Sequence, residues 1–381
     1  MIRIGVDGNE ANVEKKVGVS VYTLNLLRYF SKVADQEHCF IVYLKNSLSL
    51  GLPEENKYFK YKVIKGNFLW SQIYLPIYLS THREIDVYFS PAHYLPSFCP
   101  VPQVVTIHDL AYQYFPNDFT KKDLWQLKNW TRSSVKKANK IIAVSKTTKK
   151  DIIKIYNVDD AMVTVIYNGY EKIAKEKTSA VEGRSGKTAE VKLKKYILFV
   201  GTIQPRKNLD ILIDAFNKFL EQNKNFKLVI VGKKGWLYED IFKKVRTLKL
   251  EEEVIFTDHV TDEELVWYYQ NAFCFVLPSL YEGFGIPILE AMSNNCPTII
   301  SMNSSLPEVG GEASLYFDPK SSNDLLEKLK TLYNNHELRK ELISKGKQRI
   351  KDFSWKKCGK ETLEVILKTV FDQRRSLSNS L

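Results

Sequence analysis

Short apolar runs that alternate with helix-length segments are the feature that most constrains the fold of this chain. In the N-terminal half the runs are 2–6, 39–44, 87–89, 104–107, 141–144 and 163–166. In the C-terminal half they are 196–200, 226–231, 254–256, 272–277 and 298–300. Such alternation is typical of buried parallel strands that are joined by crossover helices. The sequence therefore predicts an α/β protein with two doubly wound, Rossmann-like sheets.

Amphipathic segments between these runs supply the expected helices. They are 19–33 and 121–138 in the first half, and 208–220, 237–248, 262–271, 287–293 and 322–334 in the second. A last helix is expected at 355–371. A polar tail follows it, and we expect this tail to fray from residue 374 onward.

The chain is long enough for two domains, because single cores stop growing beyond roughly 250–300 residues and this chain has 381 residues. Residues 173–194 are rich in Lys, Glu, Ser, Thr and Gly and nearly lack apolar periodicity, which predicts a linker. We expect an N-terminal domain at 1–172 and a C-terminal domain at 195–354. Residues 355–381 would form a C-terminal helix and tail. In one arrangement, this helix and tail return to the N-terminal domain.

Cysteine usage and hydropathy point to the cytoplasm. The five cysteines are scattered and have no CxxC spacing, which favours reduced thiols over a disulfide framework or a zinc site. No apolar stretch is long enough to span a bilayer, and the N-terminus begins with a strand rather than a signal peptide. We expect a cytoplasmic protein, with peripheral attachment to the inner face of the membrane as a second option.

The net charge of +12 calls for an anionic partner. Residues 121–154 carry eleven Lys or Arg and only two Asp, with two tryptophans interleaved. A solvated basic helix explains this pattern, and so does a patch that docks on anionic lipid. Nucleic-acid binding is disfavoured because no recognised motif accompanies the charge.

Glu282 and Glu290 frame a glycine-containing segment that follows the apolar run at 272–277. Gly283 and Gly285 allow a tight turn and a close backbone approach to a ligand. The segment reads as strand, glycine loop and helix N-terminus, and such a geometry offers backbone N–H groups to a phosphate. Carboxylates beside such a phosphate site are well placed to bind hydroxyl groups of the ligand. The pattern predicts a ligand with phosphate and several hydroxyls, such as a nucleotide sugar.

Arg206 and Lys207 occupy the corresponding place after the run at 196–200. Open α/β sheets bind ligands at the carboxyl ends of their strands. Two cations at a helix N-terminus oppose the helix dipole, so their presence calls for an anion, and we interpret them as a diphosphate clamp. The chain contains no Asp-x-Asp pair, which a metal-held diphosphate usually needs. The pattern predicts that no metal takes part.

Two features of the N-terminal half are candidates for a second part of the site. His108 and Asp109 end the run at 104–107, where a structural histidine and a ligand contact are equally consistent with the sequence. Gly18 precedes the helix at 19–33, and a glycine there could admit a phosphate.

Together these segments resemble the large family 4 of retaining glycosyltransferases with the GT-B fold. The resemblance covers nearly the full length. It rests on 201–209, 278–292 and 304–309, with 105–109 and 142–145 in the N-terminal half. It implies two Rossmann-like domains that face a central cleft. It also implies hexose transfer from a nucleotide diphosphate sugar to a saccharide or lipid-linked saccharide, in polysaccharide or glycolipid synthesis.

The resemblance further implies a donor and a role for each site residue. The segments at 201–209 and 278–309 are most similar to mannosyltransferases, so GDP-mannose is the favoured donor, a UDP-sugar is the alternative, and no cofactor is expected. Arg206 and Lys207 would bind the diphosphate and stabilise the leaving group. Glu282 and His108 would contact the donor sugar, and Glu290 would accept hydrogen bonds from the ribose. Further donor contacts are implied for Gly283, Phe284, Gly285, Ser305, Leu306, Val260 and Gly18.

Two alternatives belong to other classes. A GT-B sugar-nucleotide epimerase fits the fold but accounts less well for Arg206 and Lys207 together with the paired glutamates. A non-enzymatic basic protein that binds membranes or nucleic acid accounts for the charge, but it has no need for these four residues together.

Overall fold

The structure, a computed structural model, describes residues 1–378 apart from 15, 17, 68, 172–194 and 236. The predicted linker at 173–194 lies outside the described residues. The chain forms two compact units. Unit 1 contains Met1–Tyr114, Thr120–Gly169 and Phe353–Leu381, and unit 2 contains Phe115–Phe119 and Tyr170–Asp352.

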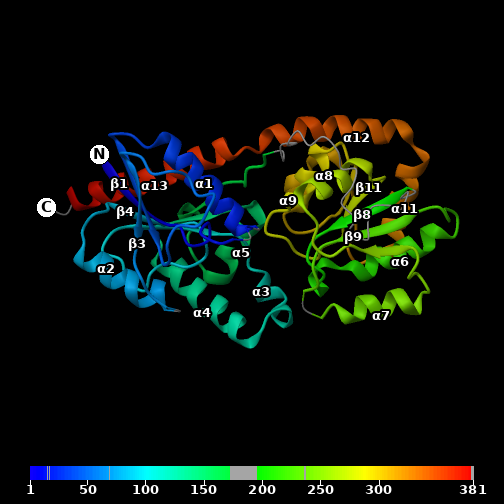
Figure 1. The fold of residues 1–381 in the computed structure, drawn as a ribbon, viewed down its shortest axis with the longest axis horizontal. Helices are drawn as coiled ribbons and strands as arrows, with labels where there is room; N and C mark the ends of the chain where they lie inside the picture. Colours follow the sequence, from blue (N-terminus) through cyan, green and yellow to red (C-terminus); the bar gives the residue numbers. More distant parts are fainter. Residues whose placement is uncertain (15, 17, 68, 172–194, 236, 379–381) are drawn as a thin grey trace. The chain divides into compact units, whose positions relative to one another are not determined.

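Unit 1 is built on a seven-stranded sheet in the order β3-β2-β1-β4-β5-β6-β7, and every pair of neighbours is parallel (Figure 1). The order reverses between β1 and β4, the switch point of a doubly wound sheet. The strands are β1 (Ile2–Asp7), β2 (His38–Leu44), β3 (Phe59–Val63), β4 (Val87–Ser90), β5 (Gln103–Ile107), β6 (Lys140–Ala143) and β7 (Val163–Val165).

The helices of unit 1 include one from the far end of the chain, α13, drawn in red in Figure 1. The others are α1 (Val19–Val33), the π-helical turn η1 (Trp70–Tyr74), α2 (Leu75–Thr81), α3 (Ala111–Tyr114), α4 (Lys121–Lys137), α5 (Lys146–Tyr156) and the short 3-10 turn η3 (Asp160–Met162). Helix α13 (Trp355–Ser378) continues as helix beyond residue 374. The expectation that the chain frays from that residue is therefore wrong as far as Ser378.

Unit 2 repeats the scheme with six parallel strands in the order β10-β9-β8-β11-β12-β13. Its order reverses between β8 and β11. The strands are β8 (Tyr196–Val200), β9 (Lys227–Val231), β10 (Val254–Phe256), β11 (Cys274–Leu277), β12 (Thr298–Ser301) and β13 (Ser314–Phe317). The predicted α/β class with two doubly wound parallel sheets is confirmed.

The helices of unit 2 follow its strands in alternation. They are α6 (Leu209–Leu220), α7 (Glu239–Thr247), α8 (Asp262–Asn271), α9 (Ile286–Ser293), α10 (Leu306–Gly310), α11 (Ser322–Asn334) and α12 (His336–Arg349). Four short 3-10 turns also belong to this unit: η2 (Pro116–Asp118), η4 (Pro205–Lys207), η5 (Gly311–Ala313) and η6 (Ile350–Asp352).

Local sequence explains where several helices begin. Thr261 accepts a hydrogen bond from the N–H of Glu264, whose side chain bonds back to the N–H of Thr261, and this capping box starts α8. Ser145 caps α5 by accepting the N–H of Thr148. Strand β3 was not predicted, because its Phe-Lys-Tyr-Lys-Val sequence is half polar and gives no continuous apolar run.

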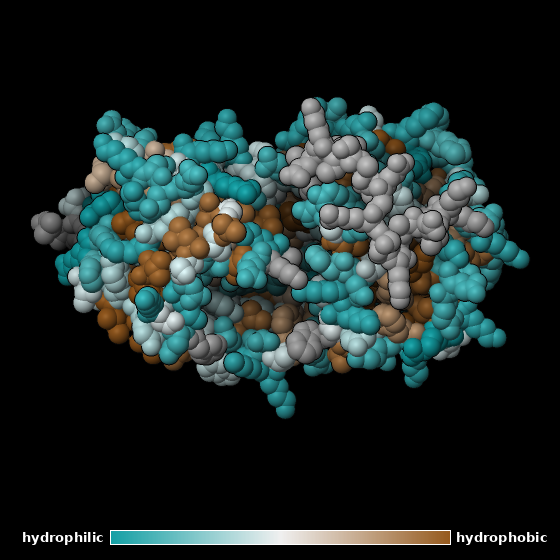
Figure 2. Space-filling view, in the orientation of Figure 1, coloured by the Kyte–Doolittle hydropathy of each residue, from teal (hydrophilic) through white to brown (hydrophobic). Residues whose placement is uncertain are grey.

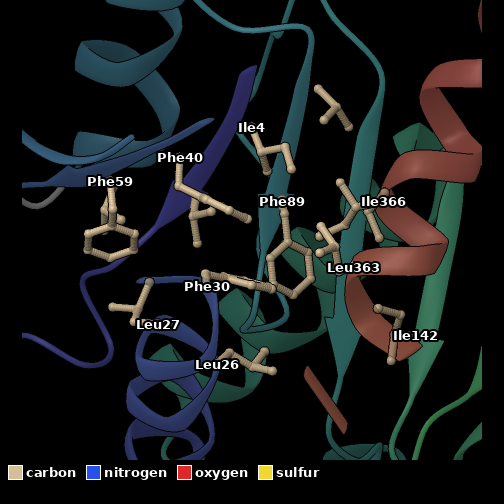
Figure 3. Packing of buried hydrophobic residues seen from close by; sticks show 14 of the residues in the cluster. Ile4, Leu26, Leu27, Phe30, Phe40, Phe59, Phe89, Ile142, Leu363 and Ile366 are labelled. Carbon is tan, nitrogen blue, oxygen red and sulfur yellow. The ribbon is translucent and has the colours of Figure 1, made fainter. Parts of the chain in front are cut away.

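Aromatic side chains fill the core of unit 1 on the face that α1 and α13 cover (Figure 3). Phe30 of α1 stacks on Phe40 of β2 with ring centroids 4.8 Å apart, and it meets Phe89 of β4 edge-on at 6.3 Å. Leu363 and Ile366 of α13 belong to the same buried cluster. The C-terminal helix is therefore part of the unit 1 core.

Gly359 lets α13 approach α1 closely. A Cβ atom at this position would lie 2.4 Å from Cγ of Tyr29 on α1. Alanine gains about 1 kcal/mol of helix propensity over glycine, but overpacking costs about 1–3 kcal/mol. We expect Gly359→Ala to lower the free energy of unfolding in urea by about 1–2 kcal/mol.

Gly346→Ala is the matched control in α12. Its Cβ would lie 3.2 Å from Cγ of the flexible Met292 side chain and 3.7 Å from the Met292 Cα, so we expect no loss of stability. Equal effects of the two substitutions would contradict the packing assigned to Gly359.

Candidate functional site

The turn after β8 presents two cations, Arg206 and Lys207. They lie on the 3-10 turn η4, which Asn208 ends in the left-handed conformation at φ 58°. The side-chain amide of Asn208 donates to the carbonyls of Pro278 (3.0 Å) and Pro319 (2.8 Å). The turn is thereby tied to the loop that follows β11.

Both backbone groups of Arg206 are also anchored. Its N–H donates to Oδ2 of Asp118 at 3.3 Å, and its carbonyl accepts the N–H of Leu280 at 2.9 Å. Asp118 is buried and lies 88 residues away in the sequence. Burial raises the pKa of Asp118, while the N–H and the charge of Arg206 oppose that rise. Asp118 is not among the residues selected from the sequence, because only the folded chain brings it to this turn.

The loop after β11 is shaped by serine hydroxyls around Glu282. Ser304 Oγ accepts the N–H of Glu282 (2.8 Å) and donates to its carbonyl (2.6 Å). Ser305 Oγ donates to the carbonyls of Glu282 and Phe284, both at 2.8 Å. Ser279 Oγ donates to Oε1 of Glu282 at 2.6 Å. These bonds fix the Glu282 carboxylate in one place.

Glu282 joins the two loops through ion pairs. Its Oε1 lies 2.5 Å from Nζ of Lys207, and its Oε2 lies 3.4 Å from Nη1 of Arg206. Nη1 of Arg206 also donates to the carbonyl of Tyr281 at 2.8 Å. All three charged side chains are only 13–14% exposed. The structure therefore brings the predicted residues Arg206, Lys207 and Glu282 into one cluster.

Electrostatics keep the Glu282 carboxylate ionised. Burial by itself would raise the pKa of Glu282, but the charges of Lys207 and Arg206 and the hydrogen bonds from Lys207 and Ser279 outweigh it. The pKa of Glu282 is lowered as a result. Nε of Arg206 is buried and has no hydrogen-bond partner among the described residues.

This cluster lies at the switch point of unit 2. Arg206 and Lys207 follow β8 and Glu282 follows β11, and these two strands are neighbours in the sheet. The crevice outside a switch point is where open α/β sheets bind ligands. The position is thus favourable for an anionic ligand.

Gly285 connects the Glu282 loop to α9. It adopts φ 115°, a conformation that L side chains rarely adopt, and it precedes the first residue of the helix. Leu306, fully buried at the start of α10, lies against it, so that a Cβ on Gly285 would come within 3.0 Å of Leu306 Cδ2. Gly283 and Phe284 complete the loop, and Phe284 is buried.

Glu290 has a different environment from Glu282. It is half-buried on α9, and its Oε2 accepts the hydroxyl of Tyr269 at 2.9 Å. Burial raises the pKa of Glu290, the charge of Asp262 adds to the rise, and the Tyr269 hydrogen bond opposes it. The two carboxylates, eight positions apart, therefore differ in partners and in the direction of their pKa shifts.

Ser305 and Val260 are two further residues that are predicted to contact the donor sugar nucleotide. The hydroxyl of Ser305 donates to the carbonyls of Glu282 and Phe284, and its N–H donates to Ser304 Oγ at 2.6 Å. Val260 is half-buried and directly precedes Thr261, the cap of α8. The donor contacts proposed for Ser305, Leu306 and Val260 stay predictions.

His108 lies in unit 1 at the end of β5. Its Nε2 bonds the carbonyl of Pro91 at 2.7 Å, and because a carbonyl only accepts, Nε2 carries the proton. Its ring meets Tyr22 edge-on at 4.8 Å. Burial and the neighbouring His93 lower the pKa of His108 to about 4, against the Pro91 bond and Asp109. The imidazole is therefore neutral at physiological pH.

His93 is a second histidine at this end of the sheet, and the sequence reading missed it. It follows β4, its Nε2 accepts the N–H of His108 at 3.4 Å, and its φ of 36° is unusual for a side chain of this size. Its Nδ1 is buried without a hydrogen-bond partner among the described residues. His93 follows a buried strand, as His108 does, so the same criterion would have selected both histidines.

Gly18 caps α1 with φ 49°, and no described atom lies within 4 Å of where its Cβ would be. The donor contact expected at Gly18 stays a prediction. No group of three or more His, Cys, Asp or Glu suited to a metal occurs among the residues that the structure describes.

The basic segment 121–154 forms α4, β6 and most of α5. Thr120 caps α4 by accepting the N–H of Asp123. Lys121, Lys128 and Arg132 are exposed along one side of α4, and Trp125 beside them is 62% exposed. Within the described part of the chain, no helix is both long and apolar enough to cross a membrane.

Glu282→Gln tests the ion cluster. Breaking a buried ion pair by removing one partner costs about 3–5 kcal/mol, and since these side chains keep some exposure we expect a loss of about 3 kcal/mol at neutral pH. The lowered pKa means that this stability is present above the ordinary glutamate pKa of 4.5 and is lost as pH falls through the folded-state value. The difference in urea unfolding between the wild type and the variant should shrink at acid pH. A difference that is constant with pH would contradict the assignment.

Two sequence-family models match the chain. Glycosyl transferases group 1 matches residues 183–349, and Glycosyltransferase Family 4 matches residues 17–172. O-antigen chain mannosyltransferase B of Escherichia coli is 29% identical over 282 residues, which cover 73% of each protein. O-antigen chain mannosyltransferase RfbU of Salmonella typhimurium is 32% identical over 217 residues. That alignment covers 57% of each chain, a little over half of the relative.

Solved structures share the fold. Sucrose-phosphate synthase from Thermosynechococcus elongatus superposes with a TM-score of 0.72 at 16% identity, covering 98% of this chain and 100% of the other. Anabaena HepE in complex with UDP and glucose gives 0.71 at 17% identity, covering 96% and 99%. The resemblance drawn from 201–209 and 278–309 is confirmed. The chain belongs to glycosyltransferase family 4 and is a glycosyltransferase of the GT-B fold.

Proposed function

We propose that this protein transfers a hexose, preferably mannose, from a nucleotide diphosphate sugar to a saccharide or lipid-linked saccharide. The transfer retains the anomeric configuration and needs no metal ion. The observation that carries the proposal is the cluster of Arg206, Lys207 and Glu282 at the switch point of unit 2.

The two cations suit a diphosphate leaving group. Among the described residues, Glu282 is the one acidic side chain in ion-pair contact with both, so the three charges sum to +1. Arginine offers a planar fork of donors and lysine a compact charge, and both stabilise negative charge that develops on phosphate oxygens. We propose that they take the role that a metal ion has in other diphosphate sites.

Glu282 is proposed to bind hydroxyls of the donor sugar as an ionised acceptor. A carboxylate held by two cations and the hydroxyl of Ser279 is a poor nucleophile, because its charge is already stabilised in the ground state. This supports attack by the acceptor on the same face of an oxocarbenium-like centre. The leaving phosphate would then assist deprotonation of the acceptor hydroxyl.

Other residues are proposed to orient the donor. Glu290 would accept the ribose hydroxyls, and Gly283, Phe284 and Gly285 would allow the backbone to approach sugar and phosphate. His108 would contact the sugar as a neutral imidazole. Lesser donor contacts are proposed for Ser305, Leu306, Val260 and Gly18.

The relatives support the choice of sugar. The E. coli and Salmonella relatives are named O-antigen chain mannosyltransferases, which favours GDP-mannose and a lipid-linked saccharide acceptor. The HepE structure contains UDP and glucose, so a UDP-sugar is the alternative. Such an acceptor would place the protein on the inner face of the membrane, with residues 121–154 facing anionic lipid. Nucleic acid is not a proposed partner.

A panel of nucleotide sugars tests the proposal. The full chain is heated with each of GDP-mannose, UDP-glucose, UDP-galactose and UDP-N-acetylglucosamine, once in EDTA and once with Mg²⁺. Ligand at about 100 times its Kd adds about 2.7 kcal/mol of stability, so the true donor should raise Tm by about 5 °C or more. If no nucleotide sugar raises Tm, the donor proposal is overturned. If Tm rises only with the divalent ion, the proposal that no metal takes part is overturned.

Lys207→Ala tests the cation in the mechanism. Removing one donor of this kind costs about 10²–10³ in kcat, so transfer should fall by that factor while circular dichroism stays unchanged. Lys224→Ala, an exposed lysine beyond α6, is the matched control and should transfer normally. Normal turnover in Lys207→Ala would remove this residue from the mechanism.

A further inference from the structure

Unit 1 carries a ridge of exposed apolar side chains on η1, α2 and the loop at 94–99. We call it the apolar ridge, and its members are Leu69, Ile73, Tyr74, Ile77 and Phe98. Ile77 is 61% exposed, Phe98 57% and Ile73 43%. Figure 2 shows hydrophobic side chains gathered on the lower part of unit 1, over the region where Figure 1 places α2. Single exposed apolar residues are normal, but a contiguous group marks an interaction surface.

The ridge is one face of an anchored helix pair. Leu69, Ile73 and Ile77 follow a spacing of four residues, which places them along one side of a helical segment. The other side is buried through Trp70, Leu75 and Leu79. The indole N–H of Trp70 donates to the carbonyl of Ile64 at 2.6 Å, which fixes the start of the segment.

The Phe98 loop is bonded to the same segment. Ser97 Oγ donates to the carbonyl of Gln72 at 2.5 Å, and the Ser97 N–H donates to the carbonyl of Ser71 at 3.3 Å. Phe98 therefore extends the apolar face of η1 and α2. Since both parts are held by hydrogen bonds, the ridge is a preformed surface.

The segment that carries most of the ridge is rich in basic residues. Residues 57–83 contain Lys57, Lys60, Lys62, Lys65 and Arg83. Of these, Lys62 is paired with Glu84, with Nζ 2.8 Å from Oε2. On the other side, Nζ of Lys137 donates to the carbonyl of Ser97 at 2.7 Å, next to Phe98. An apolar centre with a cationic rim has the charge and polarity of a surface that enters the boundary of an anionic bilayer.

Helix α4 continues this rim. The N–H of Leu95 donates to Oγ of Ser134 on α4 at 2.8 Å, and the rings of Tyr94 and Trp130 lie 5.4 Å apart. The basic side of α4 and the ridge therefore flank the same loop. The α4 surface offers charge with one exposed tryptophan, whereas the ridge offers the aliphatic side chains that can enter the acyl region.

We propose that the apolar ridge inserts into an anionic lipid bilayer while the surrounding lysines contact the head groups. This proposal rests on the proposed function in one respect, since insertion of the ridge would place the protein beside a lipid-linked acceptor. Lysine stems can lie along the apolar face and keep the ammonium groups among the head groups. A nucleic acid would use the cations but not the exposed isoleucines and leucine, so charge and polarity together favour lipid.

Ile73→Ser/Ile77→Ser tests the ridge with the full chain. Both side chains are exposed, so the double variant should unfold in urea like the wild type. Cosedimentation is measured with vesicles of phosphatidylcholine alone and of phosphatidylcholine with phosphatidylglycerol. We expect wild-type binding to the mixed vesicles that weakens but persists at high salt. The double variant should lose at least about tenfold in partition coefficient, because burial of each isoleucine favours partition by about 1.5–3 kcal/mol.

Leu48→Ser/Leu50→Ser is the matched control. Both leucines are exposed, Leu50 almost completely, but they lie outside the ridge. This variant should bind vesicles like the wild type. Transfer to a water-soluble acceptor should be the same in all three proteins, so a failure of the transfer assay would count against the proposed function and leave the lipid result to decide the ridge.

Three outcomes would overturn the proposal. The first is that the wild type fails to bind mixed vesicles. The second is that the ridge variant binds them as well as the control does. The third is that light scattering shows a wild-type dimer that the ridge substitutions dissociate without any change in vesicle binding, because the ridge would then cover a second copy of the chain.

Discussion

The ion cluster of Arg206, Lys207 and Glu282 is the interaction on which the account of unit 2 depends. It joins the turn after β8 to the loop after β11 and gives both loops one fixed geometry. Without Glu282, the described part of the chain would leave Arg206 and Lys207, both largely buried, with no counter-charge in ion-pair contact. Without the cations, burial would favour the neutral form of Glu282. The same charges that hold the loops together are those that a diphosphate needs.

Topology explains why these residues meet. In each unit the strand order reverses once, and the loops at that point splay apart and leave room for a ligand. In unit 2 the reversal lies between β8 and β11. In unit 1 it lies between β1 and β4, and β4 pairs with β5, the strand that His108 follows. One rule of sheet architecture thus accounts for the placement of most candidate residues.

Much of this could be predicted from the sequence, for identifiable reasons. Continuous apolar runs marked most strands, and the residues directly after them supplied Arg206, Lys207, Glu282 and His108. Predictions failed where local patterns carry little information. Strand β3 alternates with lysines, and α13 stays helical in a polar sequence that resembles a frayed tail. Asp118 could not be found because its contact with Arg206 spans 88 residues. The apolar ridge could not be found either, since only packing decides which side of α2 stays exposed.

A double-mutant cycle between Lys207 and Glu282 tests the central claim most directly. The free energies of urea unfolding of the wild type, Lys207→Met, Glu282→Gln and the double variant give the coupling free energy of the pair. The account predicts a coupling of at least about 1.5 kcal/mol at neutral pH, since neighbours in one ion network couple by about 0.5–3 kcal/mol and these side chains are largely buried. Effects that add to within about 0.5 kcal/mol would contradict it.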